Sequence, residues 1–223
     1  MSRIIVIILV SLLGFSVSHQ SYADTQEIDS LQEITNKAQQ GDAEAQFKLG
    51  FVYSTGRGVP QDFKQSFFWT EKSAQQGYAL AQYILGVGYR VGENVPQDYK
   101  KAVHWFEKSA QQGLVLAQYE LGAMYFRGRG VPQDYKKAAH WHQKSAQQGY
   151  AAAQLILGAM YNEGLGVPQD YKQAYAWFNV ASAQGYEGAK KARDFAAEKL
   201  TPSALTEAQA LSNEYYKKYG GKE

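Results

Sequence analysis

The chain contains no cysteine, so no disulfide can stabilise it and no lipid can be attached to an N-terminal cysteine. An excess of charge of one sign is also missing, because 23 Lys and Arg residues balance 21 Asp and Glu residues to a formal net charge of +2. This near-neutral balance argues against nucleic acid or an anionic membrane as a partner held by bulk charge. Stability must come from burial of apolar surface, which 223 residues can supply.

A long apolar run is absent as well. The apolar segment 4–17 is shorter than the roughly 20 residues that span a bilayer. It follows the basic residue Arg3 and precedes small residues at Ser21 and Ala23, which is the layout of a secretory signal. We therefore predict a signal peptide over 1–23, cleaved after Ala23, and a periplasmic or secreted chain without stable membrane insertion. An uncleaved membrane anchor is the alternative.

Repetition is what the chain has instead. A 36-residue unit occurs four times without a gap, at 41–76, 77–112, 113–148 and 149–184. In the first copy Ala45, Leu49 and Tyr53 recur at a spacing of four, which is one face of a helix. A glycine- and proline-rich turn follows, and Asp62 is well placed as the N-cap of a second helix. Each copy therefore predicts helix, turn and helix, closed by a left-handed glycine such as Gly77.

Several residues recur at fixed places in these copies. A glycine inside the first helix costs about 1 kcal/mol relative to alanine, so its repetition predicts a close approach of two helices. These glycines are Gly50, Gly86, Gly122 and Gly158. We interpret the tryptophans of the second helix as core packing: Trp69, Trp105, Trp141 and Trp177. The glutamines that border this core are expected to bond a neighbouring backbone group: Gln46, Gln82, Gln118 and Gln154.

The ends of the chain are predicted to cap the repeats. Residues 24–40 carry an apolar stripe and form an N-terminal capping helix. Residues 185–223 hold a degenerate fifth repeat and a C-terminal capping helix, which opens at Thr201 and runs to about Tyr219. In the second copy Asn94 replaces a turn glycine and is expected to keep the left-handed conformation.

The motif Ala-x-x-x-Leu-Gly-x-x-Tyr, then Gly-x-Gly-Val-Pro-Gln-Asp-Tyr, then Ala-x-x-Trp is complete over 117–141. It resembles the Sel-one-like repeat, the 36-residue relative of the tetratricopeptide repeat, and the resemblance covers 41–184. The first copy departs from the motif at Phe63 and Ser66. The resemblance implies an all-α, right-handed α/α superhelix, a solenoid of helix–turn–helix repeats with capping helices. It also implies an adaptor that assembles other proteins, and some exported bacterial members are linked to envelope functions or host contact.

Motifs for catalysis are missing. The sequence contains no Ser-x-x-Lys, Gly-x-Ser-x-Gly, His-Glu-x-x-His or Gly-x-x-x-x-Gly-Lys pattern. His104 and His140 share one place in consecutive copies and are interpreted as solvated, while His142 turns toward another side of its helix. We therefore predict no catalytic residue, no metal site and no cofactor. The alternative is a cell-wall or β-lactam-directed hydrolase, because a secreted branch of the family has been credited with β-lactam binding or hydrolysis.

One face of the first helices is unusually apolar for a surface. Four places in each copy, spaced three, four and three apart, form a stripe that we expect to line the concave side. The alternative is that neighbouring first helices bury this stripe between them. We predict a groove for a protein or peptide on a monomeric scaffold. The candidate partner-binding residues are Phe47, Phe51, Tyr83, Arg90, Tyr119, Phe126, Leu155 and Asn162.

Overall fold

The computed structural model of the chain describes residues 23–92 and 94–220, in which all regular structure is helical. The helices are α2 (Ala23–Gln39), α3 (Ala43–Thr55), α4 (Phe63–Gln75), α5 (Ala79–Val91), α6 (Tyr99–Gln111), α7 (Val115–Arg127), α8 (Tyr135–Gln147), α9 (Ala151–Glu163), α10 (Tyr171–Ala183), α11 (Ala189–Glu198) and α12 (Pro202–Tyr219). The predicted signal peptide lies outside the described residues except for Ala23, so its cleavage stays a prediction.

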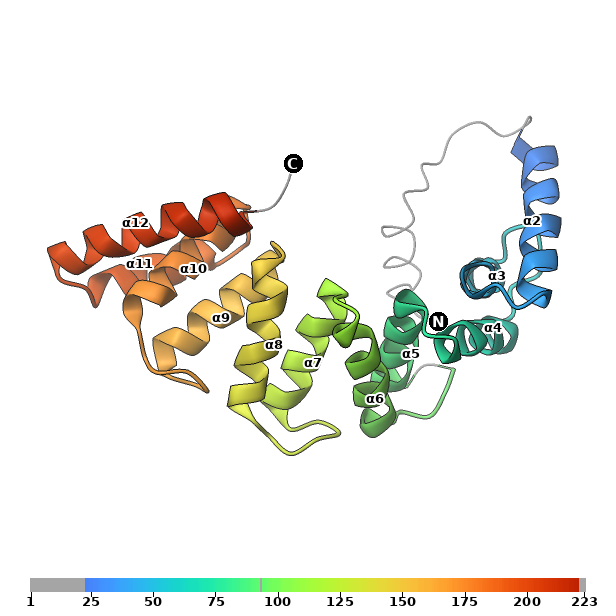
Figure 1. The fold of residues 1–223 in the computed structure, drawn as a ribbon, viewed down its shortest axis with the longest axis horizontal. Helices are drawn as coiled ribbons and strands as arrows, with labels where there is room; N and C mark the ends of the chain where they lie inside the picture. The colour runs from blue at the N-terminus through green and yellow to red at the C-terminus, as the bar shows by residue number, and fades with distance from the viewer. Residues whose placement is uncertain (1–22, 93, 221–223) are drawn as a thin grey trace. The chain divides into compact units, whose positions relative to one another are not determined.

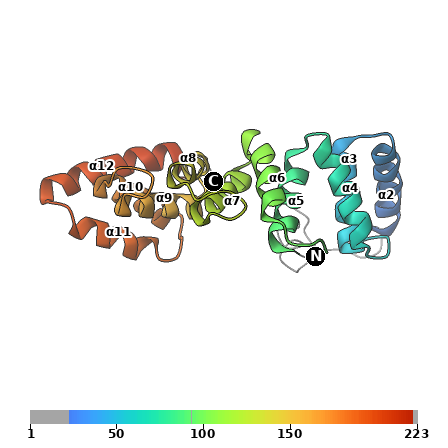
Figure 2. The same ribbon diagram turned by 90° about the horizontal axis from the view of Figure 1, so that it is seen from below.

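The chain folds as two compact units, one ending at Leu114 and the other beginning at Val115. The first unit contains α2 and the pairs α3–α4 and α5–α6, and α2 lies beside α3 and α4 in both views (Figure 1 and Figure 2). The second unit contains the pairs α7–α8 and α9–α10, with α11 and α12 both packed on α10. The predicted all-α architecture of tandem helix–turn–helix repeats is confirmed.

The ends of the helices follow the sequence signals. The side chain of Asp62 accepts hydrogen bonds from the N–H groups of Lys64 and Gln65 at 2.8 and 3.0 Å. Asp98, Asp134 and Asp170 cap the other second helices in the same way. A cap of this kind stabilises a helix by about 1 kcal/mol. In the turn of the second repeat Asn94 has a φ of 63°, the predicted left-handed conformation.

The glycines inside the first helices make room for a side chain of the paired second helix. A methyl group at Gly86 would lie 2.5 Å from the ring of Phe106, which is closer than packed atoms approach. The corresponding place in the other second helices holds a side chain that faces its own glycine: Thr70, His142 and Phe178. The predicted close approach is confirmed, and the packing gained there offsets the roughly 1 kcal/mol that a helical glycine costs.

A matched pair of glycines in α5 tests this account. Gly86→Ala is expected to lower the free energy of unfolding by about 1–2 kcal/mol, because overpacking against Phe106 outweighs the gain in helix propensity. At Gly88 an added methyl group would meet nothing within 4 Å, so Gly88→Ala is expected to stabilise the chain by up to about 1 kcal/mol. Urea unfolding measures both changes, and equal shifts would contradict the steric explanation.

Glutamine side chains connect successive repeats. The Nε2 of Gln82 donates to the carbonyl of Ala74 at 3.1 Å, and its Oε1 accepts a hydrogen bond from Gln112 at 2.8 Å. The first bond joins this repeat to the preceding one, and the second joins the first helix of the repeat to its own C-terminal end. Together they fix how neighbouring helix pairs stack. The predicted bond to a neighbouring backbone carbonyl is also present at Gln46 and Gln154.

The C-terminal helix α12 begins at Pro202, as predicted, and ends at Tyr219. It packs on α10, which lies between α11 and α12 (Figure 2), whereas the second helix of each complete repeat packs on its own first helix. Tyr215 and Tyr219 pack against Trp177, which is 2 % exposed and belongs to the core as predicted. The other three tryptophans are only half-buried: Trp69, Trp105 and Trp141.

Candidate partner-binding surface

The eight residues of the predicted stripe divide into two groups. Four are buried, each at most 9 % exposed: Phe47, Phe51, Tyr83 and Asn162. Four are half-buried: Arg90, Tyr119, Phe126 and Leu155. The stripe is therefore not one open groove, and only the second group has side-chain surface that a partner can reach.

In the first unit the aromatic residues of the stripe are used for packing. The ring of Phe47 lies 5.3 Å from that of Tyr78, and the ring of Tyr83 lies 6.0 Å from that of Phe106. Phe51 is buried on the same face of α3 as Phe47. The stacking of helices already removes Phe47, Phe51 and Tyr83 from solvent, which corrects the expectation that they line an open groove.

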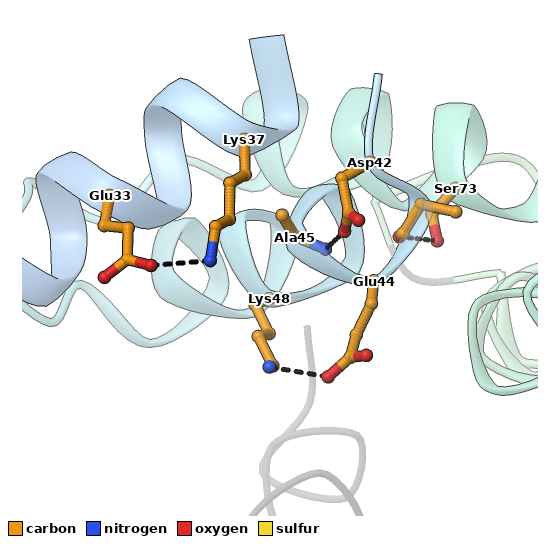
Figure 3. A network of polar contacts seen from close by, with 8 residues as sticks. Glu33, Lys37, Asp42, Glu44, Ala45, Lys48 and Ser73 are labelled. Carbon is orange, nitrogen blue, oxygen red and sulfur yellow. Dashed lines mark hydrogen bonds and ion pairs between the residues drawn. The ribbon is translucent and has the colours of Figure 1, made fainter. Parts of the chain in front are cut away.

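The outer surface of α2 and α3, at the start of the first unit, is polar. Glu44 and Lys48 form an ion pair on α3 at 2.6 Å, and Glu33 and Lys37 form another on α2 at 2.5 Å (Figure 3). The hydrogen bond from Lys37 lowers the pKa of the Glu33 carboxyl below its usual range. All four side chains are 45–66 % exposed, so this face is a solvated charged surface and not an apolar groove.

Two tyrosines of the second unit pack together where its helix pairs meet, and a third lies near enough to act on the pKa of both. They are Tyr119 in α7, Tyr150 just before α9 and Tyr186 just before α11. The rings of Tyr119 and Tyr150 lie edge to face at 5.1 Å. Tyr186 is 40 % exposed and close enough to influence the pKa of both other hydroxyls. We call Tyr119, Tyr150 and Tyr186 the tyrosine patch.

Burial governs the chemistry of the tyrosine patch. It raises the pKa of Tyr119 and of Tyr150 above the usual range, and the Tyr186 hydroxyl and the Glu120 carboxylate add to the effect. Both hydroxyls therefore stay protonated at neutral pH and can donate hydrogen bonds. Tyrosine combines a large apolar ring with such a donor, which is why it is enriched at protein interfaces.

The remaining stripe residues of the second unit are held by their own neighbours. Phe126 lies edge-on to Tyr135 at 5.2 Å, and Leu155 packs on the cluster around Phe178. Asn162 donates to Glu163 at 2.7 Å, while its Oδ1 meets no hydrogen-bond donor among the described residues. Asn162 is buried, which corrects the expectation that it faces an open groove. The binding role of Phe126 and Leu155 stays a prediction.

Sequence reasoning missed Tyr150 and Tyr186. Both directly follow the glycine that closes a repeat, and Tyr78 and Leu114 stand at the same place in the other copies. Turns of this kind usually carry polar residues. An aromatic or leucine there in every copy was the signal that could have placed these residues on a packed or binding surface.

Among the described residues, no group of three His, Asp or Glu side chains is placed to hold a metal ion. His104 and His140 are exposed, as interpreted, and each lies beside its neighbouring tryptophan. His142 is buried, with its ring 5.4 Å from that of Tyr119. Within 23–92 and 94–220, no helix combines the length and the apolar character that a membrane crossing needs.

Comparison with known families decides what the four helix pairs are. The Sel1 repeat model matches four consecutive segments, at 43–78, 79–114, 115–150 and 151–186. The chain belongs to the Sel1 repeat family. This confirms the resemblance, since the Sel1 repeat is the Sel-one-like repeat named above. Sel1 repeat proteins are generally protein-interaction scaffolds, and their fold is typically non-enzymatic.

Two solved structures resemble this Sel1 repeat protein. One is a Sel1 repeat protein from Oxalobacter formigenes, 39 % identical over 74 % of this chain and 48 % of its own, with a TM-score of 0.68. The other is a protective antigen from uropathogenic Escherichia coli with an SLR fold, 33 % identical over 95 % of this chain and 52 % of its own, with a TM-score of 0.57. The chain spans about half the length of each. No curated protein matches it.

Proposed function

We propose that this Sel1 repeat protein is an exported scaffold that binds a protein or peptide through the tyrosine patch, on the side that the repeats are expected to make concave. The observation that carries the proposal is the edge-to-face pair of Tyr119 and Tyr150 at 5.1 Å, with Tyr186 close enough to act on the pKa of both. Tyr186 remains 40 % exposed although its ring is large and apolar. An exposed tyrosine beside two half-buried ones is typical of binding hot spots.

The chemistry of the patch points to the character of the partner. Its rings favour apolar side chains, and its protonated hydroxyls favour backbone carbonyls or carboxylates as acceptors. The Glu120 carboxylate and the Arg127 guanidinium both act on the pKa of Tyr119, so charges of both signs lie near the patch. We therefore expect a peptide segment with apolar residues that offers backbone carbonyls or carboxylates as acceptors.

Export and an envelope role belong to the same proposal. The apolar segment 4–17 and the small residues before Asp24 support a cleaved signal. One relative, 33 % identical, is described as a protective antigen of uropathogenic Escherichia coli, which supports an envelope or host-contact role for this chain. That relative is about twice as long, so its whole activity is not transferred here.

Photo-crosslinking in intact cells tests the proposal. A photoreactive phenylalanine analogue at Tyr186 is expected to give discrete adducts with a partner protein, recovered with a chain that begins at Asp24. The matched control is the same analogue at Tyr216, which is 52 % exposed in the same unit but lies on α12. Adducts of equal identity and yield at both places would contradict the tyrosine patch.

A substitution measures the strength of the contact. Tyr186→Ser is expected to weaken binding of the crosslinked partner by about 2 kcal/mol, the value of an interface hot spot. Tyr216→Ser is expected to leave binding unchanged, and both side chains are exposed enough to be replaced without loss of the fold. Calorimetry with the identified partner measures both, and an unchanged affinity for Tyr186→Ser would remove this surface from the proposal.

A further inference from the structure

The last turn of α9 contains a buried side chain with an acceptor atom that lacks a donor. Asn162 is 9 % exposed, and its Nδ2 donates to the Oε1 of Glu163 at 2.7 Å. Its Oδ1 is buried and meets no hydrogen-bond donor among the described residues. A buried acceptor without a partner costs free energy, which a hydrogen-bond donor from another molecule would recover.

The bond to Glu163 fixes which atom of the amide is left without a partner. If the amide were turned over, the Oδ1 of Asn162 would face the carboxylate, and two acceptors would oppose each other. The Nδ2 therefore stays on the side of Glu163. The backbone carbonyl of Asn162 is already used, because it accepts a hydrogen bond from Gln169 at 2.8 Å. The side-chain oxygen is thus the acceptor of Asn162 that remains.

The charge at this end of α9 favours a cation. Glu163 is the last residue of the helix, where the partial negative charge of the helix dipole disfavours a carboxylate. The last turn of α9 contains no basic residue, whereas α5 and α7 carry Arg90 and Arg127 there. Glu163 is exposed, and within the described part of the chain it forms an ion pair with no cation, Arg127 included. A cation from outside the chain would compensate both the carboxylate and the helix end.

Aromatic rings lie close to the turn that follows α9. This turn approaches α8 so closely that a methyl group at Gly166 would lie 2.0 Å from the backbone oxygen of Tyr135. The ring of Tyr135 in turn lies edge to face with that of Phe126, at 5.2 Å. Phe126 is half-buried and holds in α7 the place that Asn162 holds in α9. Two residues of the predicted stripe therefore stand at corresponding ends of neighbouring first helices.

We propose that the C-terminal end of α9 binds an arginine side chain of a partner protein, and we call Asn162 and Glu163 the arginine site. A guanidinium is planar and carries five N–H donors, so it can donate to the Oδ1 of Asn162 and to the Glu163 carboxylate at once. Its flat face also packs on aromatic rings such as that of Phe126. A lysine ammonium supplies the charge without the planar fork, and a calcium ion needs more oxygen ligands than these two side chains offer.

The arginine site is separate from the tyrosine patch. Tyr150 directly precedes α9 and Asn162 lies 12 positions further along, which is about 18 Å at the rise of a helix. The arginine site uses an unpaired acceptor and a carboxylate, whereas the tyrosine patch uses rings and hydroxyl donors. It therefore does not rest on binding at the tyrosine patch, and a partner can reach either surface alone.

A titration with small ligands on the full chain tests the proposal. The probe is the amide of Nα-acetylarginine, and the controls are the amides of Nα-acetylcitrulline, which has a similar shape without the charge, and of Nα-acetyllysine. The readouts in NMR spectra are the side-chain amide signal of Asn162 and the backbone N–H signals of Glu163 and Glu198. The arginine probe is expected to shift the first two signals and to bind at least about tenfold more tightly than either control. Calcium chloride is titrated in parallel, and binding of calcium in place of arginine would overturn the proposal.

Two variants of the arginine site complete the test. Asn162→Leu removes the unpaired oxygen but keeps a similar shape, so the fold is expected to be retained while binding of the arginine probe weakens about tenfold. Glu163→Gln keeps an acceptor for Asn162 and removes the charge, and a similar loss is expected. Glu163 is exposed, so this variant retains the fold even if Asn162→Leu does not.

The matched control is Glu198→Gln. Glu198 is also an exposed carboxylate at the last position of a helix in the second unit, but Ala197 precedes it in place of an asparagine. Binding of the arginine probe is expected to stay unchanged in this variant and in Tyr186→Ser, which separates the result from the tyrosine patch. Equal affinity for arginine and citrulline, equal shifts at Glu163 and Glu198, or unchanged binding by Glu163→Gln would each overturn the proposal.

Discussion

Trp177→Ala is expected to lower the free energy of unfolding by about 3–5 kcal/mol, the largest loss among the single substitutions considered. The indole of Trp177 is 2 % exposed and packs on α9, on α8 and on both tyrosines of α12. Its removal leaves a cavity and also takes away the ring on which Tyr215 and Tyr219 rest. Urea unfolding monitored by circular dichroism measures the loss.

The matched control is Trp105→Ala, at the same place in the second repeat. Trp105 is half-buried, and no tyrosine of the described chain stacks on it, so the expected loss is about half as large. Hydrogen exchange adds a second readout, because contacts in a repeat protein are made mainly between neighbours. For Trp177→Ala the amides of α12 are expected to lose protection while those of α3 keep it. Equal losses for the two variants would mean that α12 contributes little.

Local features of this chain were predictable because their causes lie within a few residues. Asp62 caps α4 through the N–H groups two and three positions later, and Asn94 takes the left-handed turn that its side chain tolerates. The glycine inside the helix at position 86 predicted a close helix contact, although the sequence did not identify Phe106 as its partner. Because each cap, turn and helical glycine recurs in four copies, the 36-residue period and the helix pairs could be predicted.

The candidate site was harder to predict because exposure depends on what stacks against a helix. Phe47 and Tyr119 occupy the same place in their repeats, yet the first is 2 % exposed and the second is half-buried. The difference comes from the neighbouring residues of each unit, which periodicity does not reveal. The placement of α12 on Trp177 is likewise set by contacts between segments distant in sequence.

The buried histidine of the third repeat connects the core to the tyrosine patch. His142 is 1 % exposed and occupies the place of Phe106 and Phe178 in the neighbouring repeats, against the helical glycine Gly122. Burial, and next the positive charge of Arg127, lower its pKa from 6.5 to about 4. The folded chain therefore favours the neutral imidazole, and its Nδ1 meets no hydrogen-bond partner among the described residues.

Stability is consequently expected to fall with acid in a defined window. The folded pKa of His142 lies below the unfolded value, so the unfolded chain binds the proton more readily. Stability is complete above pH 6.5 and is lost as the pH falls from 6.5 toward 4, by about 2 kcal/mol at pH 5 and about 3 kcal/mol in total. Urea unfolding at pH 7.5 and pH 5 measures this loss.

His142→Phe isolates the contribution of this one side chain. Phenylalanine already fills the same place in the second and fourth repeats, so the variant is expected to fold with its ring against Gly122. It is expected to be more stable than the parent at pH 5 by about 2 kcal/mol or more and to lose the part of the pH dependence that His142 causes. Carboxylates that titrate in the same range are present in both chains and cancel in the comparison. If the two chains lose the same stability between pH 7.5 and pH 5, the acid sensitivity arises elsewhere and the imidazole is not buried as described.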